Sequence, residues 1–78
     1  MDPARLVYMA NQIGKFFATE DAKTAVAMTA DHLKKFWDPR MRNEIVAYVE
    51  AGGQGLDGPV HQAVLMLRKP VTPAGAQT

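Results

Sequence analysis

The sequence predicts a small all-α protein: a bundle of three helices, a short fourth helix and a flexible C-terminal tail. Apolar residues recur at spacings of three and four along most of the chain, which is the period of one helix face. No run of alternating polar and apolar residues is long enough for a pair of strands. We expect one helical domain over residues 1–69 and a flexible tail over 70–78, because "KPVTPAGAQT" has no periodicity.

The first helix is expected from Pro3 to about Thr19. Asp2 and Pro3 resemble an N-cap followed by proline at the first helical position. Five residues form the predicted apolar face: Leu6, Met9, Ile13, Phe16 and Phe17. Gly14 lies within this pattern and costs about 1 kcal/mol relative to alanine. We therefore expect Gly14 to mark the close approach of another backbone.

The second helix is expected from about Asp21 to Phe36. Seven residues form one stripe, and four of them are small or short: Ala22, Ala25, Val26, Thr29, Ala30, Leu33 and Phe36. Small side chains allow another helix to approach closely. Because the first helix carries large apolar side chains, we expect the two to pack as an antiparallel pair joined by the turn "ATEDA".

The third helix is expected to begin at Pro39. The residue before a proline avoids the α region, so Asp38 should end the second helix and cap the third. Its apolar face consists of Met41, Ile45, Tyr48 and Val49. The helix should end in "AGGQG", where Gly52 or Gly53 can take the left-handed C-terminal conformation.

The fourth helix is expected to start at "DGP", residues 57–59, and to stop before Pro70. Its inner side consists of Val60, Ala63, Val64 and Leu67. We expect the compact core to be formed by the first three helices, with the fourth as a short addition.

The composition argues against several classes of function. The 78 residues carry a net charge of +1, which is too small to indicate nucleic acid or an anionic membrane as a bulk partner. The chain has no cysteine and no serine, so disulfides, thiolate metal sites and the two commonest nucleophiles are missing. No stretch approaches the roughly 18 apolar residues of a membrane span, and the N-terminus lacks a basic signal region. These features predict a cytoplasmic protein.

No residue pattern indicates a catalytic, cofactor-binding or metal site in this chain. His32 and His61 lie 29 positions apart, whereas a zinc site usually needs three or four ligands, so we expect surface or boundary histidines. The stretch "AGGQGLDG" lacks the lysine of a phosphate-binding loop and follows a helix.

The segment "HLKKFWDPRMRNEI" is the most informative part of the chain. It gathers four cations around the only tryptophan: Lys34, Lys35, Arg40 and Arg42. Cations interleaved with aromatic residues are typical of nucleic-acid surfaces, but the low net charge and the neighbouring acids argue against that interpretation.

Two interpretations of this segment remain equally open. Phe36 and Trp37 can plug a corner between two helices, with Asp38 as its cap. Exposed tryptophan, methionine and arginine together also match the composition of protein interfaces. Since side chains two apart on a helix diverge, we expect one of Arg40 and Arg42 to fold back to Asp38 or Glu44 and the other to face outward.

Three segments together resemble the delta subunit of NAD-dependent formate dehydrogenase: "MANQIGKFF", "ADHLKKFWDPRMRNEI" and "AGGQGL", within roughly residues 5–67. The resemblance implies an accessory subunit of a cytoplasmic molybdenum- or tungsten-containing complex that oxidises formate and passes electrons to NAD⁺. Without cysteine, this chain cannot carry a cysteine-ligated iron–sulfur cluster. The resemblance implies that the bis-pterin metal cofactor, the iron–sulfur clusters, FMN and NAD are carried by partner subunits.

We therefore expect a non-catalytic subunit that docks on the large catalytic subunit and stabilises the assembly, in contact with its electron-transfer subunits. In this hypothesis Trp37 is a buried anchor, and Arg40 and Arg42 pair with partner carboxylates or carbonyls. The expected partner interface consists of Tyr8, Asn11, Gln12, Phe36, Trp37, Asp38, Pro39, Arg40, Met41 and Arg42. The alternatives are a maturation factor that aids insertion of the metal cofactor and a small nucleic-acid-binding domain.

Overall fold

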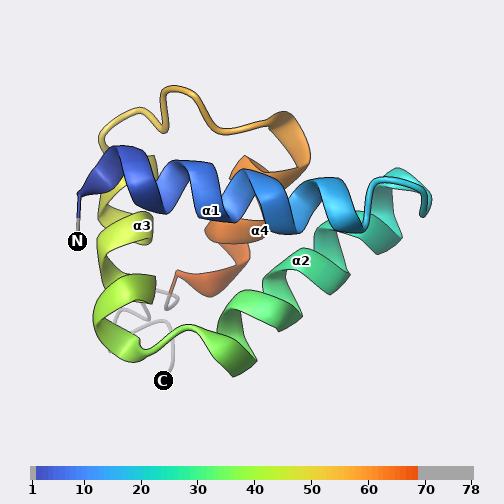
Figure 1. Ribbon diagram of the computed structural model, residues 1–78, viewed down its shortest axis with the longest axis horizontal. Coiled ribbons are helices and arrows are strands. Elements are labelled where there is room, and N and C mark those ends of the chain that lie inside the picture. The colour runs from blue at the N-terminus through green and yellow to red at the C-terminus, as the bar shows by residue number, and fades with distance from the viewer. Residues whose placement is uncertain (1, 69–78) are drawn as a thin grey trace, which may run out of the picture.

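The computed structural model describes residues 2–68, which fold into four helices and contain no strand. The helices are α1 (Pro3–Phe16), α2 (Ala22–Phe36), α3 (Pro39–Glu50) and α4 (Gly58–Leu67) (Figure 1). The predicted all-α architecture is confirmed, and the four helices follow in the predicted order, although α1 ends at Phe16, before the expected end near Thr19. The tail expected over 70–78 lies outside the described residues.

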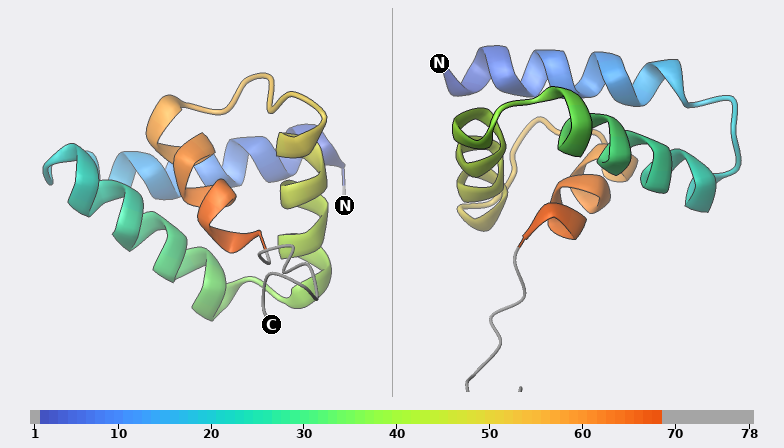
Figure 2. Two further views of the ribbon diagram at one scale, coloured as in Figure 1. Left: turned by 180° about the vertical axis from the view of Figure 1, so that it is seen from behind. Right: turned by 90° about the horizontal axis from the view of Figure 1, so that it is seen from below.

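The four helices pack with α1 lying across one side of the other three (Figure 2). After the turn, α2 runs back in the opposite direction but diverges from α1, and α3 stands at the far end (Figure 1). The most extensive helix contact is between α2 and α4. The small-residue face of α2 therefore packs chiefly against α4, and the predicted pairing with α1 is the minor contact. Ala63 on α4 is fully buried, so small residues on both helices allow the close approach.

The hydrophobic core contains side chains from all four helices and from the corner between α2 and α3. Its buried members are Leu6, Ala10, Leu33, Trp37, Ile45, Val49, Val60 and Val64. Val60 and Val64 belong to α4, so the expectation of a core built by the first three helices is wrong. Apolar residues follow one another through most of α4, which suits a helix that lies between the others.

Two phenylalanines expected in the core lie at the surface. Phe16 is 78% exposed and Phe36 is 72% exposed. The inward face of α1 follows Leu6 and Ala10 and leads on to Phe17, which is half-buried, so Phe16 lies to one side of it. Phe36 is the last residue of α2, where that helix has diverged from α1, and so α1 does not cover it (Figure 1).

Aspartates begin the helices, as the sequence predicts. Asp2, Asp21 and Asp38 each accept a hydrogen bond from a backbone N–H in the first turn of the following helix, at 3.2, 2.8 and 2.9 Å. Such a cap is worth about 1 kcal/mol. Asp57 precedes α4 without a capping bond from its side chain. That carboxylate is therefore available to another group.

Glycine ends α3, also as predicted. Gly52 and Gly53 have φ angles of +133° and +66°. Their N–H groups donate to the carbonyls of Val49 and Tyr48, both at 3.0 Å. These two bonds form the Schellman pattern that commonly closes a helix. Gly53 is also buried, and a Cβ there would strike the ring of His61.

Gly14 marks the place where α1 meets α4. A Cβ built on Gly14 would collide with Cγ2 of Val60, a side chain that is 1% exposed. The predicted close approach at Gly14 is confirmed, although the neighbouring group is a side chain and not a backbone.

Candidate functional site

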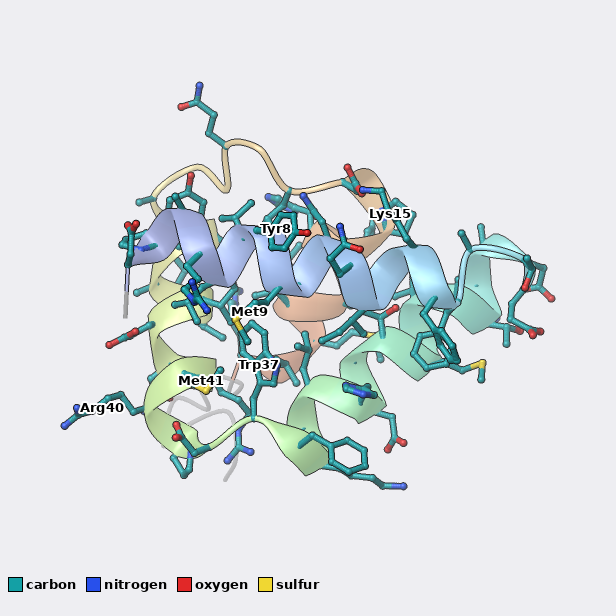
Figure 3. All side chains as sticks on the ribbon, viewed as in Figure 1. Tyr8, Met9, Lys15, Trp37, Arg40 and Met41 are labelled. Atoms are coloured by element: carbon teal, nitrogen blue, oxygen red, sulfur yellow. The ribbon has the colours of Figure 1, made fainter. Side chains whose placement is uncertain are left out.

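Trp37 belongs to the interior of this chain. It is 5% exposed and forms part of the core, with Met9 and Met41 packed against that core. Figure 3 shows all three side chains gathered beneath α1. The indole therefore packs as the corner-plug interpretation describes, and it presents almost no surface to a partner.

Asp38 and Arg42 hold the corner between α2 and α3 from within. The Asp38 carboxylate caps α3, and Pro39 takes the first helical position. Nη1 of Arg42 donates to the carbonyl oxygens of Lys34 and Trp37, at 2.8 and 2.7 Å. These carbonyls lie at the C-terminal end of α2, where helical partners are missing.

Arg40 points away from the body of the protein (Figure 3). The expected division between an inward and an outward arginine is thus present, and Arg42 is the inward one, bonded to backbone carbonyls. The rest of the basic cluster is also divided. Lys35 pairs with Asp31 at 3.1 Å, whereas Lys34 makes no ion pair within residues 2–68. The four cations therefore do not form a continuous basic surface.

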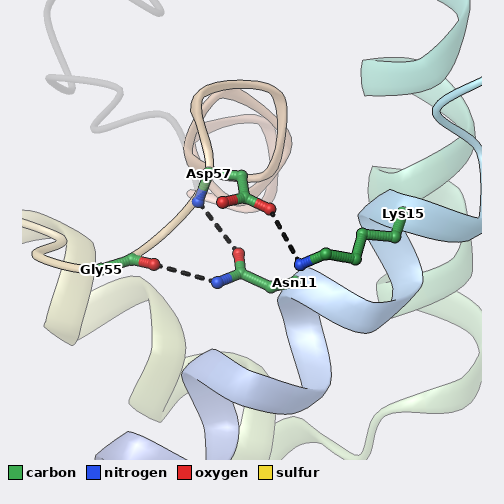
Figure 4. Close-up of polar contacts among 4 residues, drawn as sticks. All are labelled: Asn11, Lys15, Gly55 and Asp57. Atoms are coloured by element: carbon green, nitrogen blue, oxygen red, sulfur yellow. Dashed lines mark hydrogen bonds and ion pairs between the residues drawn. The ribbon is translucent and has the colours of Figure 1, made fainter.

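Asn11 fastens the loop between α3 and α4 to α1 (Figure 4). Its amide nitrogen donates to the carbonyl of Gly55 at 2.9 Å, and its amide oxygen accepts from the N–H of Asp57, also at 2.9 Å. Lys15 adds an exposed ion pair to the Asp57 carboxylate at 3.7 Å. Both ends of the Asn11 amide are therefore used inside this chain.

The α1 residues of the expected interface are Tyr8, Asn11 and Gln12, which we call the helix-one edge, and the two other than Asn11 are exposed. Tyr8 is 65% exposed, and Gln12 is also exposed. Each lies two residues from the buried Ala10, and two residues turn a helix by about 200°, so both point away from the core. In Figure 3, Tyr8 and Arg40 lie far apart. The structure therefore does not bring the helix-one edge and the corner together into one surface.

A groove along the outer side of α2 is the feature that sequence reasoning missed. It has a volume of about 440 Å³ and is open to solvent. We call it the α2 groove, and its lining residues are Phe17, Ala27, Met28, Asp31, His32, Lys35 and Phe36. A signal was present in the sequence, because Met28, His32 and Phe36 follow one another at spacings of four and so share one side of a helix.

Aromatic rings connect α1 to the end of α2 along this groove. Phe16 contacts Phe17 edge to face, with ring centroids 5.1 Å apart. Phe17 lies 6.3 Å from His32, and His32 lies 4.7 Å from Phe36. Such separations are typical of interacting aromatic pairs. The exposed Phe16 and Phe36 thus belong to a continuous row of rings.

The histidines and carboxylates of residues 2–68 do not gather into a cluster suited to a metal ion. Both histidines are half-buried, as expected of boundary residues. Residues 2–68 contain no group of three or more His, Cys, Asp or Glu side chains suited to a metal ion.

Asp21 precedes α2, and its carboxyl group has a pKa below the ordinary value for aspartate. The backbone N–H of Thr24 donates to its carboxylate at 2.8 Å, and this bond, with a further one from the Thr24 side chain, lowers the pKa of Asp21. This is the effect expected of an N-cap, because the hydrogen bonds favour the charged form. Asp21 therefore serves to start α2.

None of the four described helices has the length and apolar character needed to cross a membrane.

No curated protein and no solved structure matches the chain. The family model of the NADH-dependent formate dehydrogenase delta subunit, FdsD, matches residues 5–64. This range includes the corner, the Asn11 contacts and the α2 groove, and it covers most of the 78 residues. The chain belongs to the NADH-dependent formate dehydrogenase delta-subunit family.

Proposed function

We propose that this chain is a non-catalytic accessory subunit of a cytoplasmic, molybdenum- or tungsten-containing formate dehydrogenase that reduces NAD⁺. It docks on the large catalytic subunit and stabilises the assembly. Membership of the delta-subunit family supports a place in such a complex. The small size of the chain supports a dependent role, because a domain of this length buries only about 60% of its unfolded surface.

The chemistry belongs to other subunits in this proposal. The chain has no cysteine or serine, and its Asn11 and Arg42 side chains bond to backbone groups of the chain itself. The metal–pterin cofactor, the iron–sulfur clusters, FMN and NAD are carried by the catalytic and electron-transfer subunits. Formate oxidation and NAD⁺ reduction therefore occur outside this chain.

The observation that carries the proposal is that large apolar side chains remain exposed on a chain that buries its only tryptophan. Tyr8, Phe16, Phe36 and Met66 are each at least 60% exposed. Phe36 and Arg40 contact the large subunit from the corner, and Tyr8 and Gln12 make a second contact from α1. The remaining residues of the expected interface support the fold of this chain: Asn11, Trp37, Asp38, Pro39, Met41 and Arg42.

Affinity purification of the tagged chain from the cells that make it, followed by mass spectrometry and metal analysis, tests this function. We expect a fixed integral ratio of this chain to a large subunit that contains molybdenum or tungsten, together with flavin and iron–sulfur subunits. Recovery of metal-free large subunit alone would instead favour a maturation factor. Recovery of no formate dehydrogenase subunit would overturn the proposal, and salt-dependent binding of nucleic acid would then be the next test.

A further inference from the structure

We propose that the α2 groove receives a short amphipathic helix of the large subunit, which places apolar side chains against Phe36 and Met28 and a carboxylate beside Lys34 and Lys35. This inference rests on the proposed function and names the surface and the chemistry of the contact. It assigns a role to Phe16, Phe17, Met28 and His32, which the corner and the helix-one edge do not include.

The groove has the length and the apolar character that such a helix requires. Met28, His32 and Phe36 span eight residues, which is about 12 Å along α2, or a little over two turns. Apolar side chains spaced three and four residues apart on a partner helix match this length. Phe36 is 72% exposed, so its ring is available for burial when a partner lies in the groove.

His32 contributes to the apolar character of the groove. Its ring lies between those of Phe17 and Phe36. Its Nδ1 atom is buried and has no hydrogen-bond partner within the described residues. The imidazole is thus held chiefly by ring contacts, and with Phe17 and Phe36 it forms an aromatic wall.

The charges at the two ends of α2 indicate the chemistry and the direction of the partner helix. Glu20 and Asp21 precede α2, and Lys34 and Lys35 occupy its last turn. Lys35 lines the groove and is already paired with Asp31. Lys34 lies beside the groove, in a neighbouring hollow that shares Asp31 with it, and its ammonium has no ion pair within residues 2–68. A helix that runs antiparallel to α2, with acidic residues in its first turn and basic residues in its last turn, brings opposite charges together at both ends.

A second copy of this chain fits the surface less well. In a two-fold dimer, residues near the axis meet their own equivalents. A dimer centred on Phe36 would therefore bring Lys34 and Lys35 of one copy close to the same lysines of the other. A partner with a carboxylate at this position avoids that repulsion.

The first test measures how much of this chain is retained on the formate dehydrogenase complex when it is purified through the large subunit. Phe36→Asp places a charge in the groove, and Phe36→Ser removes the ring without adding one. Leu65→Asp is the control, because Leu65 is an exposed apolar residue on α4 that lines neither the groove nor the neighbouring hollow that contains Lys34 and Met66. Circular dichroism of each variant confirms that the helices are intact.

We expect both Phe36 variants to weaken association by at least about tenfold and Leu65→Asp to weaken it by much less. Equal losses for Phe36→Asp and Leu65→Asp would overturn the assignment of the groove. Retention of both Phe36 variants at the wild-type level would overturn the groove and the proposed corner contact of Phe36, while leaving the place of the chain in the complex intact. Absence of the wild-type chain from the complex would overturn the proposed function itself.

Carbodiimide cross-linking of the wild-type complex tests the charge argument. This reagent joins an amine to a carboxylate that is in direct contact with it. We expect Lys34 or Lys35 to be joined to an aspartate or glutamate in a helix of the large subunit. Cross-links from these lysines only to a second copy of this chain would overturn the proposal. The same holds if other lysines, such as Lys23, are joined to the large subunit while Lys34 and Lys35 are not.

Discussion

Substitution of Gly14 by alanine is the sharpest test of how α1 packs on α4. Gly14 lies within α1, where alanine is favoured over glycine by about 1 kcal/mol. The added methyl group would, however, collide with Cγ2 of Val60. Val60 is buried and β-branched, so its side chain has little freedom to move aside.

The two effects oppose one another, and the collision is the larger. Overpacking of a core costs about 1–3 kcal/mol, and the overlap at Val60 places Gly14→Ala in the upper part of that range. After the gain in helix propensity is subtracted, we expect a net loss of about 1–2 kcal/mol. In a domain of this size each 1 kcal/mol lowers the melting temperature by about 4–8 °C.

A double-mutant cycle with Val60→Ala separates the collision from the helix propensity. Val60→Ala removes the methyl group that Gly14→Ala would strike. In that background we expect Gly14→Ala to stabilise the chain by up to about 1 kcal/mol, because only the propensity gain remains. The assay is urea unfolding followed by circular dichroism, and the predicted result is a reversal of sign between the two backgrounds.

Gly58→Ala is the matched control, because a Cβ at Gly58 meets no atom within 4 Å. We expect that substitution to change stability by less than about 0.5 kcal/mol, as is usual for surface positions. A stabilising effect of Gly14→Ala in the wild-type chain, or the same cost in both backgrounds, would refute the account of this contact.

Three further predictions follow from the contacts described above. Trp37→Ala should cost about 3–5 kcal/mol and largely unfold the isolated chain; loss of assembly with an unchanged melting temperature would show instead that the indole is a partner anchor. Asn11→Ala should speed hydrogen exchange in the loop over 53–57 and leave exchange in α2 unchanged, because both lost bonds join that loop to α1; faster exchange throughout the chain would contradict a local role. The folded-state pKa of Asp21 is lowered, so its ionisation stabilises the fold above the unfolded-state pKa and this contribution is lost as pH falls through the folded-state pKa. Asp21→Asn keeps a good cap without a titrating group. The difference in free energy of unfolding between the wild-type chain and this variant should therefore shrink below about pH 4. A difference that stays constant from pH 2 to 7 would contradict a contribution from the Asp21 charge.

The starts and ends of the helices were predictable because they depend on neighbouring residues. Asp38 with Pro39 sets the start of α3, and Gly52 with Gly53 closes it, through bonds that span only a few residues. The position of Gly14 was also informative, since a helical glycine costs free energy that a close packing contact can offset. Local chemistry therefore predicted the element order and one contact between helices.

The packing partners were not predictable in the same way. A small-residue face on α2 indicates that a helix approaches closely, but it does not say whether that helix is α1 or α4. The divergence of α2 from α1 leaves Phe36 exposed, although its spacing from Leu33 matches an inward position. The α2 groove depends on that divergence, which the spacing of apolar residues along α2 does not reveal.

The corner shows why composition alone left two interpretations open. Trp37 and Arg42 have the composition of an interface, yet the indole is buried and the guanidinium is bonded to the end of α2. Only three-dimensional placement separates these residues from Phe36 and Arg40, which lie at the surface.

The central claim, that this chain is a stabilising subunit of formate dehydrogenase, is tested most directly by native mass spectrometry. The complex would be purified through its large subunit from cells with and without this chain. The account predicts an integral number of copies of the chain in each assembled complex and a reduced yield of intact complex in its absence. An assembled, metal-loaded and active complex that never contains the chain and forms equally well without it would contradict the account.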